Sequence, residues 1–108
     1  MAPTQLEIKV RALQRLVKEE AYYQQDLKEQ KERVNDLKSK SEVDPYDLKK
    51  QVEVLQDTER LLPTLYDKIN QFREDLNQFV QSYKGTEDTA AAKDILKEAE
   101  ELLKTNKH

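Results

Sequence analysis

The chain has 108 residues, of which 36% are hydrophobic and 38% are charged, and its formal net charge is −3. This length suits one small domain, and so little apolar material excludes a large catalytic architecture. Only one Gly and three Pro are present, which is too few turn residues for sheets and long loops. We therefore exclude β-rich and α/β folds and expect long helices joined by short corners.

The distribution of charge and the absence of cysteine limit the partners and the compartment. Basic and acidic residues alternate, so no segment has the basic density that binding to nucleic acid requires. The chain has no Cys, which excludes disulfides, thiolate metal sites and thiol catalysis. No apolar run approaches the roughly 20 residues that cross a bilayer. We therefore expect a soluble protein of a reducing compartment, with no membrane partner.

The first helix is predicted over residues 4–38. Thr4 and Glu7 have the spacing of a capping box, in which each side chain binds a backbone N–H group of the other residue. Apolar residues then recur at helical spacing and form one stripe, interrupted by Glu20. The apolar members of the stripe are Leu6, Val10, Leu13, Leu16, Val17, Tyr23, Leu27, Val34 and Leu37.

The second helix is predicted over residues 45–84. Asp44 is the expected N-cap, and Pro45 suits the first helical position because its missing N–H costs nothing there. Pro63 predicts a kink near residues 59–63, and Gly85 is expected to end the helix. A heptad series of apolar residues, with a second row beside it, forms the seam: Leu48, Leu55, Leu62, Ile69, Leu76 and Tyr83, then Val52, Leu65, Tyr66, Phe72, Phe79 and Val80.

The third helix is predicted over residues 87–105, with Thr86 as its cap. Its apolar stripe contains Ala92, Ile95, Leu96, Ala99, Leu102 and Leu103. Short corners force consecutive helices to run antiparallel. The predicted fold is therefore all-α, a single domain over residues 1–108, and an antiparallel up-down-up three-helix bundle with left-handed, coiled-coil-like packing.

The middle of the hairpin formed by the first two helices contains polar residues at seam positions. Counting outward from the first corner places Glu20 opposite Pro63 and Gln24 opposite Glu59. Thr58 lies at the same height. This pattern predicts either a hydrated, solvent-facing notch or a soft point at which the hairpin bends.

The third helix is about half as long as the second, so the corner end of the hairpin consists of two helices alone. The apolar seam there is either tolerated, used to form a homodimer, or offered to a partner. Tyr46 is the aromatic residue best placed for an interface at this end. The candidate partner-binding residues are Leu27, Lys28, Glu32, Val34, Tyr46, Leu48, Lys49, Val52 and Glu53. The half that the third helix covers is expected to have less apolar surface to offer.

No residue pattern indicates catalysis. The single His, His108, is the last residue printed, and an end position is unsuited to a general base or a ligand. The carboxylates alternate with Lys and Arg, as on solvated helix faces. One Gly cannot form a phosphate-binding loop. We expect no enzymatic activity, no catalytic residue, no metal and no cofactor.

Three segments resemble one known family: VDPYDLKKQVEVLQDTERLLPTLYDKINQF, LVKEEAYYQQ and YKGTE. The resemblance is to the tubulin-folding cofactor A (tubulin-specific chaperone A) family, above all to its fungal members. It implies a small cytosolic, cytoskeleton-associated chaperone that binds β-tubulin stoichiometrically and passes it along the αβ-tubulin assembly route without ATP hydrolysis. The heptads alone allow an alternative, a coiled-coil oligomerisation or tethering module with another helical partner, although Pro63 disfavours it.

Overall fold

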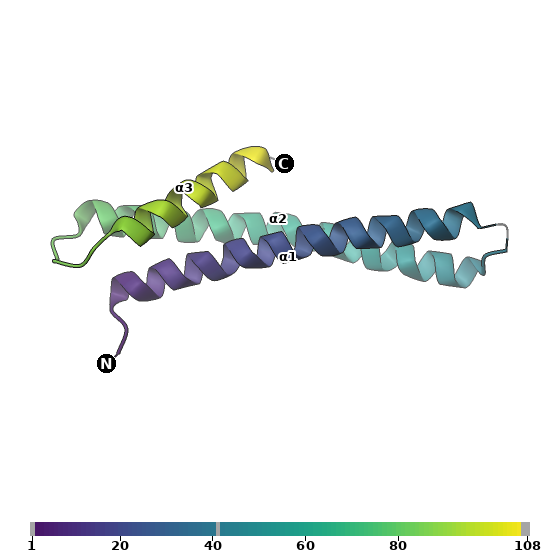
Figure 1. The fold of residues 1–108 in the computed structure, drawn as a ribbon, viewed down its shortest axis with the longest axis horizontal. Coiled ribbons are helices and arrows are strands. Elements are labelled where there is room, and N and C mark those ends of the chain that lie inside the picture. Colours follow the sequence, from purple (N-terminus) through teal and green to yellow (C-terminus); the bar gives the residue numbers. More distant parts are fainter. Residues whose placement is uncertain (1, 41, 107–108) are drawn as a thin grey trace.

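The computed structural model describes residues 2–40 and 42–106, and His108 and Ser41 lie outside this part of the chain. It contains three helices, α1 (Gln5–Ser39), α2 (Pro45–Ser82) and α3 (Ala90–Thr105). The helices α1 and α2 form a long antiparallel hairpin, and α3 folds back along one half of it (Figure 1). No strand occurs among the described residues. The predicted all-α three-helix fold is confirmed.

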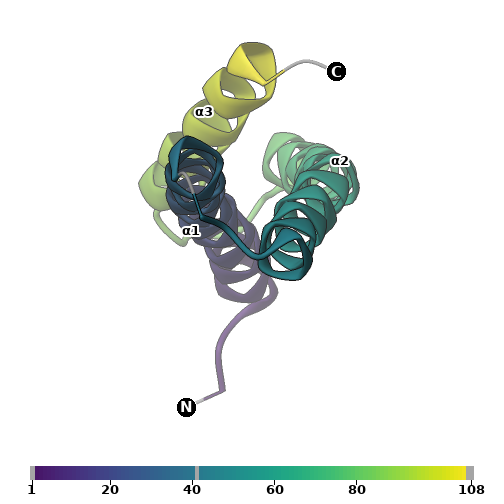
Figure 2. The same ribbon diagram turned by 90° about the vertical axis from the view of Figure 1, so that its right-hand side faces the viewer.

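The molecule is a rod. Its principal extents are 65 × 31 × 17 Å and its radius of gyration is 18.9 Å, whereas a compact chain of this length has about 13 Å. Seen along the rod, α3 leans against one side of the α1–α2 pair (Figure 2). The core is therefore a narrow seam between helices and not a central globule.

The local start signals of the first two helices act as expected. The Thr4 Oγ1 atom accepts a hydrogen bond of 3.2 Å from the backbone N–H of Glu7. The Asp44 Oδ1 atom accepts one of 2.9 Å from the N–H of Tyr46, and Pro45 occupies the first turn. Both predicted N-caps are confirmed, because each depends only on residues within one turn.

The predicted start of α3 is wrong. The helix begins at Ala90 and not at residue 87, and Thr86 does not cap it. The Asp88 Oδ1 atom accepts from the N–H of Ala90 at 2.9 Å instead. The residue expected in the first turn, Glu87, lies in the preceding loop.

Glu87 is held outside the helix because it joins the ends of the other two helices. Its Oε2 atom accepts a hydrogen bond from the Thr4 hydroxyl at 2.8 Å, and its Oε1 atom accepts one from the Tyr83 hydroxyl at 2.9 Å. The Tyr83 ring also packs on Phe79, with ring centroids 5.6 Å apart. These contacts close the end of the bundle where α1 begins and α2 ends.

Gly85 does not end α2 in the expected way. The helix ends at Ser82, its cap residue Tyr83 has extended backbone, and no residue in the described part of the chain has a positive φ. A Cβ atom at position 85 would overlap the Tyr83 ring. Gly85 is therefore favoured by the close approach of a side chain and not by a left-handed cap.

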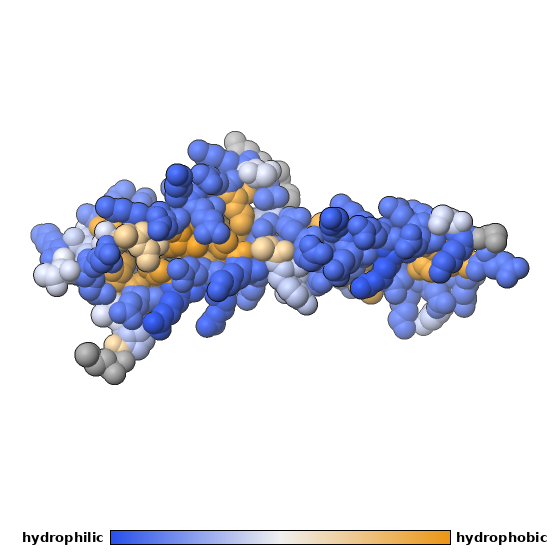
Figure 3. Space-filling view, in the orientation of Figure 1, coloured by the Kyte–Doolittle hydropathy of each residue, from blue (hydrophilic) through white to orange (hydrophobic). Residues whose placement is uncertain are grey.

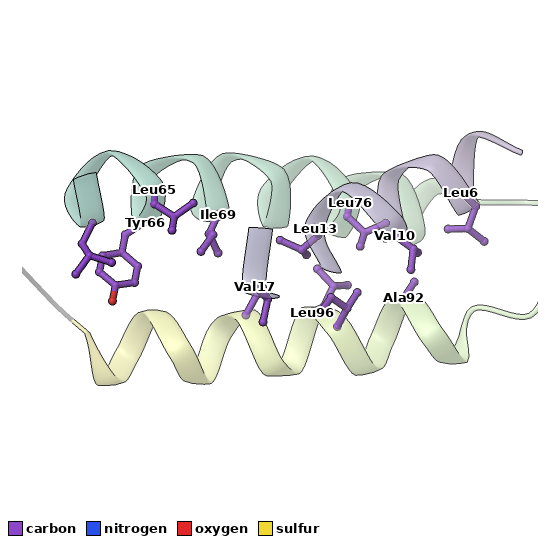
Figure 4. Packing of buried hydrophobic residues seen from close by; sticks show 13 residues of the cluster. Leu6, Val10, Leu13, Val17, Leu65, Tyr66, Ile69, Leu76, Ala92 and Leu96 are labelled. Carbon is purple, nitrogen blue, oxygen red and sulfur yellow. The ribbon is translucent and has the colours of Figure 1, made fainter. Parts of the chain in front are cut away.

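The buried apolar cluster lies almost entirely in the half that α3 covers (Figure 4). Leu13, Ile69 and Leu76 are fully buried at its centre. Three further groups of buried residues come from the three helices: Leu6, Val10 and Val17 from α1; Leu62, Leu65 and Tyr66 from α2; Ala92, Ile95, Leu96 and Ala99 from α3.

Phe72 departs from the predicted seam. It was expected in the second apolar row of α2, but it is 41% exposed. The neighbouring Arg73 lies inward instead, with its guanidinium 3.6 Å from a Glu100 carboxylate oxygen and 3.0 Å from the Asn70 side-chain oxygen. With Arg73 directed toward α3, Phe72 lies about 100° away around α2 and faces another side of the helix.

Pro63 lies inside α2, which stays helical through it. The Pro63 ring is exposed, whereas the adjacent Leu62 side chain is buried. The carbonyl group of Glu59, which loses its N–H partner, can therefore be hydrated. The bend expected at residues 59–63 stays a prediction.

The close approach of Tyr83 to Gly85 makes a prediction about stability. We expect Gly85→Ala to lower the free energy of unfolding by about 1 kcal/mol, since the ring must move and its hydrogen bond to Glu87 is lost. In a Tyr83→Ala background the new methyl group has room, and the same change should be neutral or stabilise by up to about 1 kcal/mol. Urea unfolding of the four proteins measures this difference. An equal loss in both backgrounds would contradict the role assigned to Gly85.

Candidate protein-binding surface

The register of α3 decides which part of the hairpin has a third neighbour. The Arg73–Glu100 ion pair and a hollow lined by Asn70 and Leu103 fix α3 against the second half of α2. The helix α3 therefore ends near the level of Tyr66. Beyond that level, residues 24–39 of α1 and 45–64 of α2 have only each other (Figure 1).

The seam is poorly closed in this two-helix end. Leu27, Leu48 and Val52 are only half-buried, whereas seam residues beside α3, such as Leu13 and Ile69, are fully buried. A patch of apolar surface is visible toward the tip of the hairpin (Figure 3). The expectation that two helices cannot seal their own seam is confirmed, because each apolar stripe has only one helix to cover it.

Tyr46 is the most prominent apolar group of the two-helix end. It lies in the first turn of α2 and is 66% exposed. The ammonium group of Lys50, one turn further on, lies 5.8 Å from the centroid of its ring. This cation–π contact restricts the rotation of the Tyr46 ring while the ring stays exposed. An exposed and partly fixed aromatic ring is suited to contact a partner.

The charged candidates lie on the same two helices as this apolar surface. Lys28 and Glu32 of α1 and Lys49 and Glu53 of α2 are all exposed. Within residues 2–40 and 42–106, none of the four is part of an ion pair. They remain available to pair with charges on another protein, and exposed charges of this kind influence the rate and specificity of association more than its strength.

Val34 must be removed from the predicted set. It is only 4% exposed, because it belongs to the apolar stripe with which α1 faces α2. It supports the surface from below and does not lie on it. The other eight candidates are exposed or half-buried.

A buried polar cluster marks the boundary between the two-helix end and the part that α3 covers. The Tyr66 hydroxyl donates a hydrogen bond of 2.6 Å to the Glu20 carboxylate. The Gln24 amide donates to the same carboxylate at 3.2 Å and to the Tyr66 oxygen at 2.9 Å. Glu20 and Tyr66 are each 5% exposed.

This cluster corrects two predictions from the sequence. Glu20 faces Tyr66 and not Pro63, so the expected pairing of the two helices was misplaced by about one helical turn. The solvent-facing notch is also wrong, because Glu20 and Thr58 are both buried. The Thr58 hydroxyl donates to the Val54 carbonyl at 3.2 Å and so needs no water.

The Tyr66 hydroxyl lies among these buried groups and does not face solvent. Burial, followed by the hydrogen bond to Glu20, raises the pKa of Tyr66 from 10.0 to about 12. Both effects favour the neutral phenol, since ionising it would place two negative charges together in a poorly hydrated site. Tyr66 therefore stays protonated and joins α1 to α2 across a wide pH range.

The half that α3 covers has more exposed apolar surface than its sequence predicts. Ile8 and Phe72 are 53% and 41% exposed, and with Ala12 they line a shallow groove between α1 and α2. A band of apolar surface is also visible in this half (Figure 3). The heptad count hid this feature, because it assigned Phe72 to the seam.

The geometry defines the chain as a helical protein with an open hairpin end suited to contact another protein. Within residues 2–40 and 42–106, no helix is long and apolar enough to span a membrane, and no three potential metal ligands lie together.

Comparison with known proteins gives the family. The family model "Tubulin binding cofactor A" matches residues 1–103, and the chain belongs to this family. It is 63% identical to the tubulin-specific chaperone A of Saccharomyces cerevisiae, over 95% of this chain and 97% of that protein. The chicken (Gallus gallus) protein of the same name is 30% identical, over 95% and 91%. The solved structure of "Rbl2p, beta-tubulin binding post-chaperonin cofactor" has a TM-score of 0.88 and 61% identity, with 94% of this chain and 99% of that chain covered.

The polar cluster makes a prediction about stability and pH. Tyr66→Phe leaves Glu20 buried with one donor fewer, so we expect a loss of about 1.5–3 kcal/mol in unfolding free energy near pH 8. The folded-state pKa is raised from 10.0 to about 12. The stabilisation that the protonated Tyr66 hydroxyl contributes is therefore complete below about pH 10 and is lost as the pH rises toward 12. The difference between wild type and variant should shrink over that window.

Urea unfolding at a series of pH values from 8 to 11.5 measures the difference. Tyr22→Phe is the matched control, because Tyr22 is 65% exposed and its hydroxyl should contribute nothing at any pH. A Tyr66→Phe loss that stays constant or grows with pH would contradict the role of the hydroxyl.

Proposed function

We propose that this chain binds β-tubulin with one-to-one stoichiometry in the cytoplasm and passes it along the route of αβ-tubulin assembly. The observation that carries the proposal is the similarity over nearly the whole chain to the yeast tubulin-specific chaperone A and to the β-tubulin binding post-chaperonin cofactor. Such a protein acts by binding alone, so the proposal includes no ATP hydrolysis and no other reaction.

The contact surface proposed for β-tubulin is the two-helix end. It combines half-buried Leu27, Leu48 and Val52 with exposed Tyr46. A tubulin surface that covers these residues gains the apolar burial that α3 supplies in the other half. The exposed Lys28, Glu32, Lys49 and Glu53 on the same two helices form the proposed charged rim of this surface.

This arrangement suits a partner that must later be released. A modest apolar area with adjustable charge pairs gives a transient interface, whereas a large dry one gives a permanent complex. The fully buried residues Leu13, Ile69 and Leu76 lie in the other half. Binding and release at the two-helix end therefore leave the part that maintains the fold undisturbed.

A second copy of the chain is the competing occupant of the same surface. Two hairpin ends could cover each other's apolar seams and give the homodimer that the sequence allows. Light scattering over a dilution series distinguishes the two cases. A dimer that Leu48→Asp dissociates would assign the surface to self-association, and a monomer at all concentrations would leave it open for β-tubulin.

The proposal predicts which substitutions weaken capture of purified β-tubulin in gel filtration or calorimetry. We expect Tyr46→Ala to weaken binding by about tenfold, as the loss of a central aromatic contact typically does. Lys49→Glu and Glu53→Lys should each weaken it about two- to fivefold. All three residues are exposed, so the thermal melts should match the wild type.

Lys97→Glu and Lys104→Glu are the matched controls, since both residues are exposed on α3. These changes should leave the affinity within about twofold of the wild type. If the α3 substitutions abolish capture while the Tyr46 and Lys49 changes have no effect, the binding surface is at the other end. If the wild-type protein captures no β-tubulin, the proposed function itself is wrong.

A further inference from the structure

The outer face of α1 carries a row of cations that neither the fold nor the proposed function uses. At about 100° per residue, Arg11, Arg15, Lys18 and Tyr22 all lie within a sector of about 60° on the helix surface. All four are exposed, and their side chains line one shallow hollow. We call Arg11, Arg15 and Lys18 the basic row. It lies in the half that α3 covers, well away from the hairpin tip.

The basic row forms few ion pairs within the described part of the chain. Arg11 has one weak partner, Glu7, at 3.7 Å, and both side chains are largely exposed. Arg15 and Lys18 are in no ion pair within residues 2–40 and 42–106. One acid, Glu19, lines the same hollow. The hollow therefore has three cations and one anion, although the whole chain has a net charge of −3.

The acids of α3 lie beside the basic row without pairing with it. Asp94 and Glu98 line a neighbouring hollow together with Lys18, but no bridge to Lys18 forms. These two acidic side chains lie along one side of the basic row. An anionic ligand on the row would therefore lie along α1 and avoid α3.

Tyr22 ends the row with an aromatic group. It is 65% exposed, and its ring meets that of Tyr23 edge to face, with centroids 5.9 Å apart and an interplanar angle of 71°. The contact orients an otherwise free ring. A tyrosine ring at the end of a cationic row can pack on the backbone or on an apolar side chain of a bound peptide.

We propose that the basic row with Tyr22 binds an acidic peptide segment of a partner protein. The argument is charge complementarity together with length. The basic row together with Tyr22 spans about 16 Å along the helix axis, which an extended chain covers in about five residues. A segment with several Asp or Glu residues within that length can place carboxylates on all three cations. This site is independent of the proposed β-tubulin surface at the hairpin end.

The test uses the full chain and a defined probe, an acetylated and amidated peptide of six glutamates, with six glutamines as the control peptide. In an NMR titration at low salt, the backbone amide signals of residues 11–22 should shift with the glutamate peptide only. Raising the salt to about 0.3 M should weaken binding several-fold, because the Debye length falls and the exposed charges are screened.

Charge-neutralising variants locate the site. The triple variant Arg11→Gln, Arg15→Gln, Lys18→Gln should bind the glutamate peptide at least about tenfold more weakly. The matched control is Lys31→Gln, Arg33→Gln, Lys38→Gln, which removes the same charge from exposed positions of the same helix and should retain at least half of the affinity. Tyr22→Ala should weaken binding about two- to fivefold. Circular dichroism shows whether each variant is folded.

Three results would overturn the assignment. The first is an absence of shifts at residues 11–22 at low salt. The second is an equal loss in both triple variants, which shows general attraction and no defined site. The third is tighter binding of a thymidine oligonucleotide than of the peptide, which would assign the row to nucleic acid. None of these results affects β-tubulin capture, so failure here is distinguishable from failure of the proposed function.

Discussion

The short third helix is the constraint on which the rest of the structure depends. With 16 residues, against 35 in α1 and 38 in α2, α3 can complete a three-helix core over only half of the hairpin. Apolar stripes on α1 and α2 continue past its end, where each has one neighbour and cannot be fully buried. One chain therefore has a well-packed half that maintains the fold and a thin half that retains apolar surface.

The Glu20–Tyr66–Gln24 cluster lies where these two halves meet. Burying a carboxylate is costly, and a pair of apolar residues in its place would be as stable or more so. The cluster instead favours one register of α1 against α2. The Tyr66 hydroxyl reaches the Glu20 carboxylate only when the two helices pair as observed. Heptad seams permit slippage by whole turns, and one polar contact across the seam disfavours it. The position of the two-helix surface relative to α3 therefore depends on this contact.

Sequence reasoning succeeded where the signal is local. Helical periodicity predicted the three helices, and the Thr4 and Asp44 caps depend on atoms within one turn. The sequence predictions were wrong where a residue distant in the sequence determines the position of a side chain. Glu87 leaves α3 because Thr4 and Tyr83 bind it, and Arg73 rather than Phe72 is directed toward α3, where it pairs with Glu100. The unequal helix lengths predicted a two-helix end, but the partner of Glu20 was not predictable, since it depends on how the helices pair in space.

Native-state amide hydrogen exchange tests most directly whether the molecule has a stable half and an open half. Opening free energies follow local packing. The amides of residues 6–20, 62–79 and 92–102 should therefore exchange at least about tenfold more slowly than those of residues 24–38 and 46–57, after correction for intrinsic rates. Equal protection along both long helices, or stronger protection at the hairpin tip, would contradict the account.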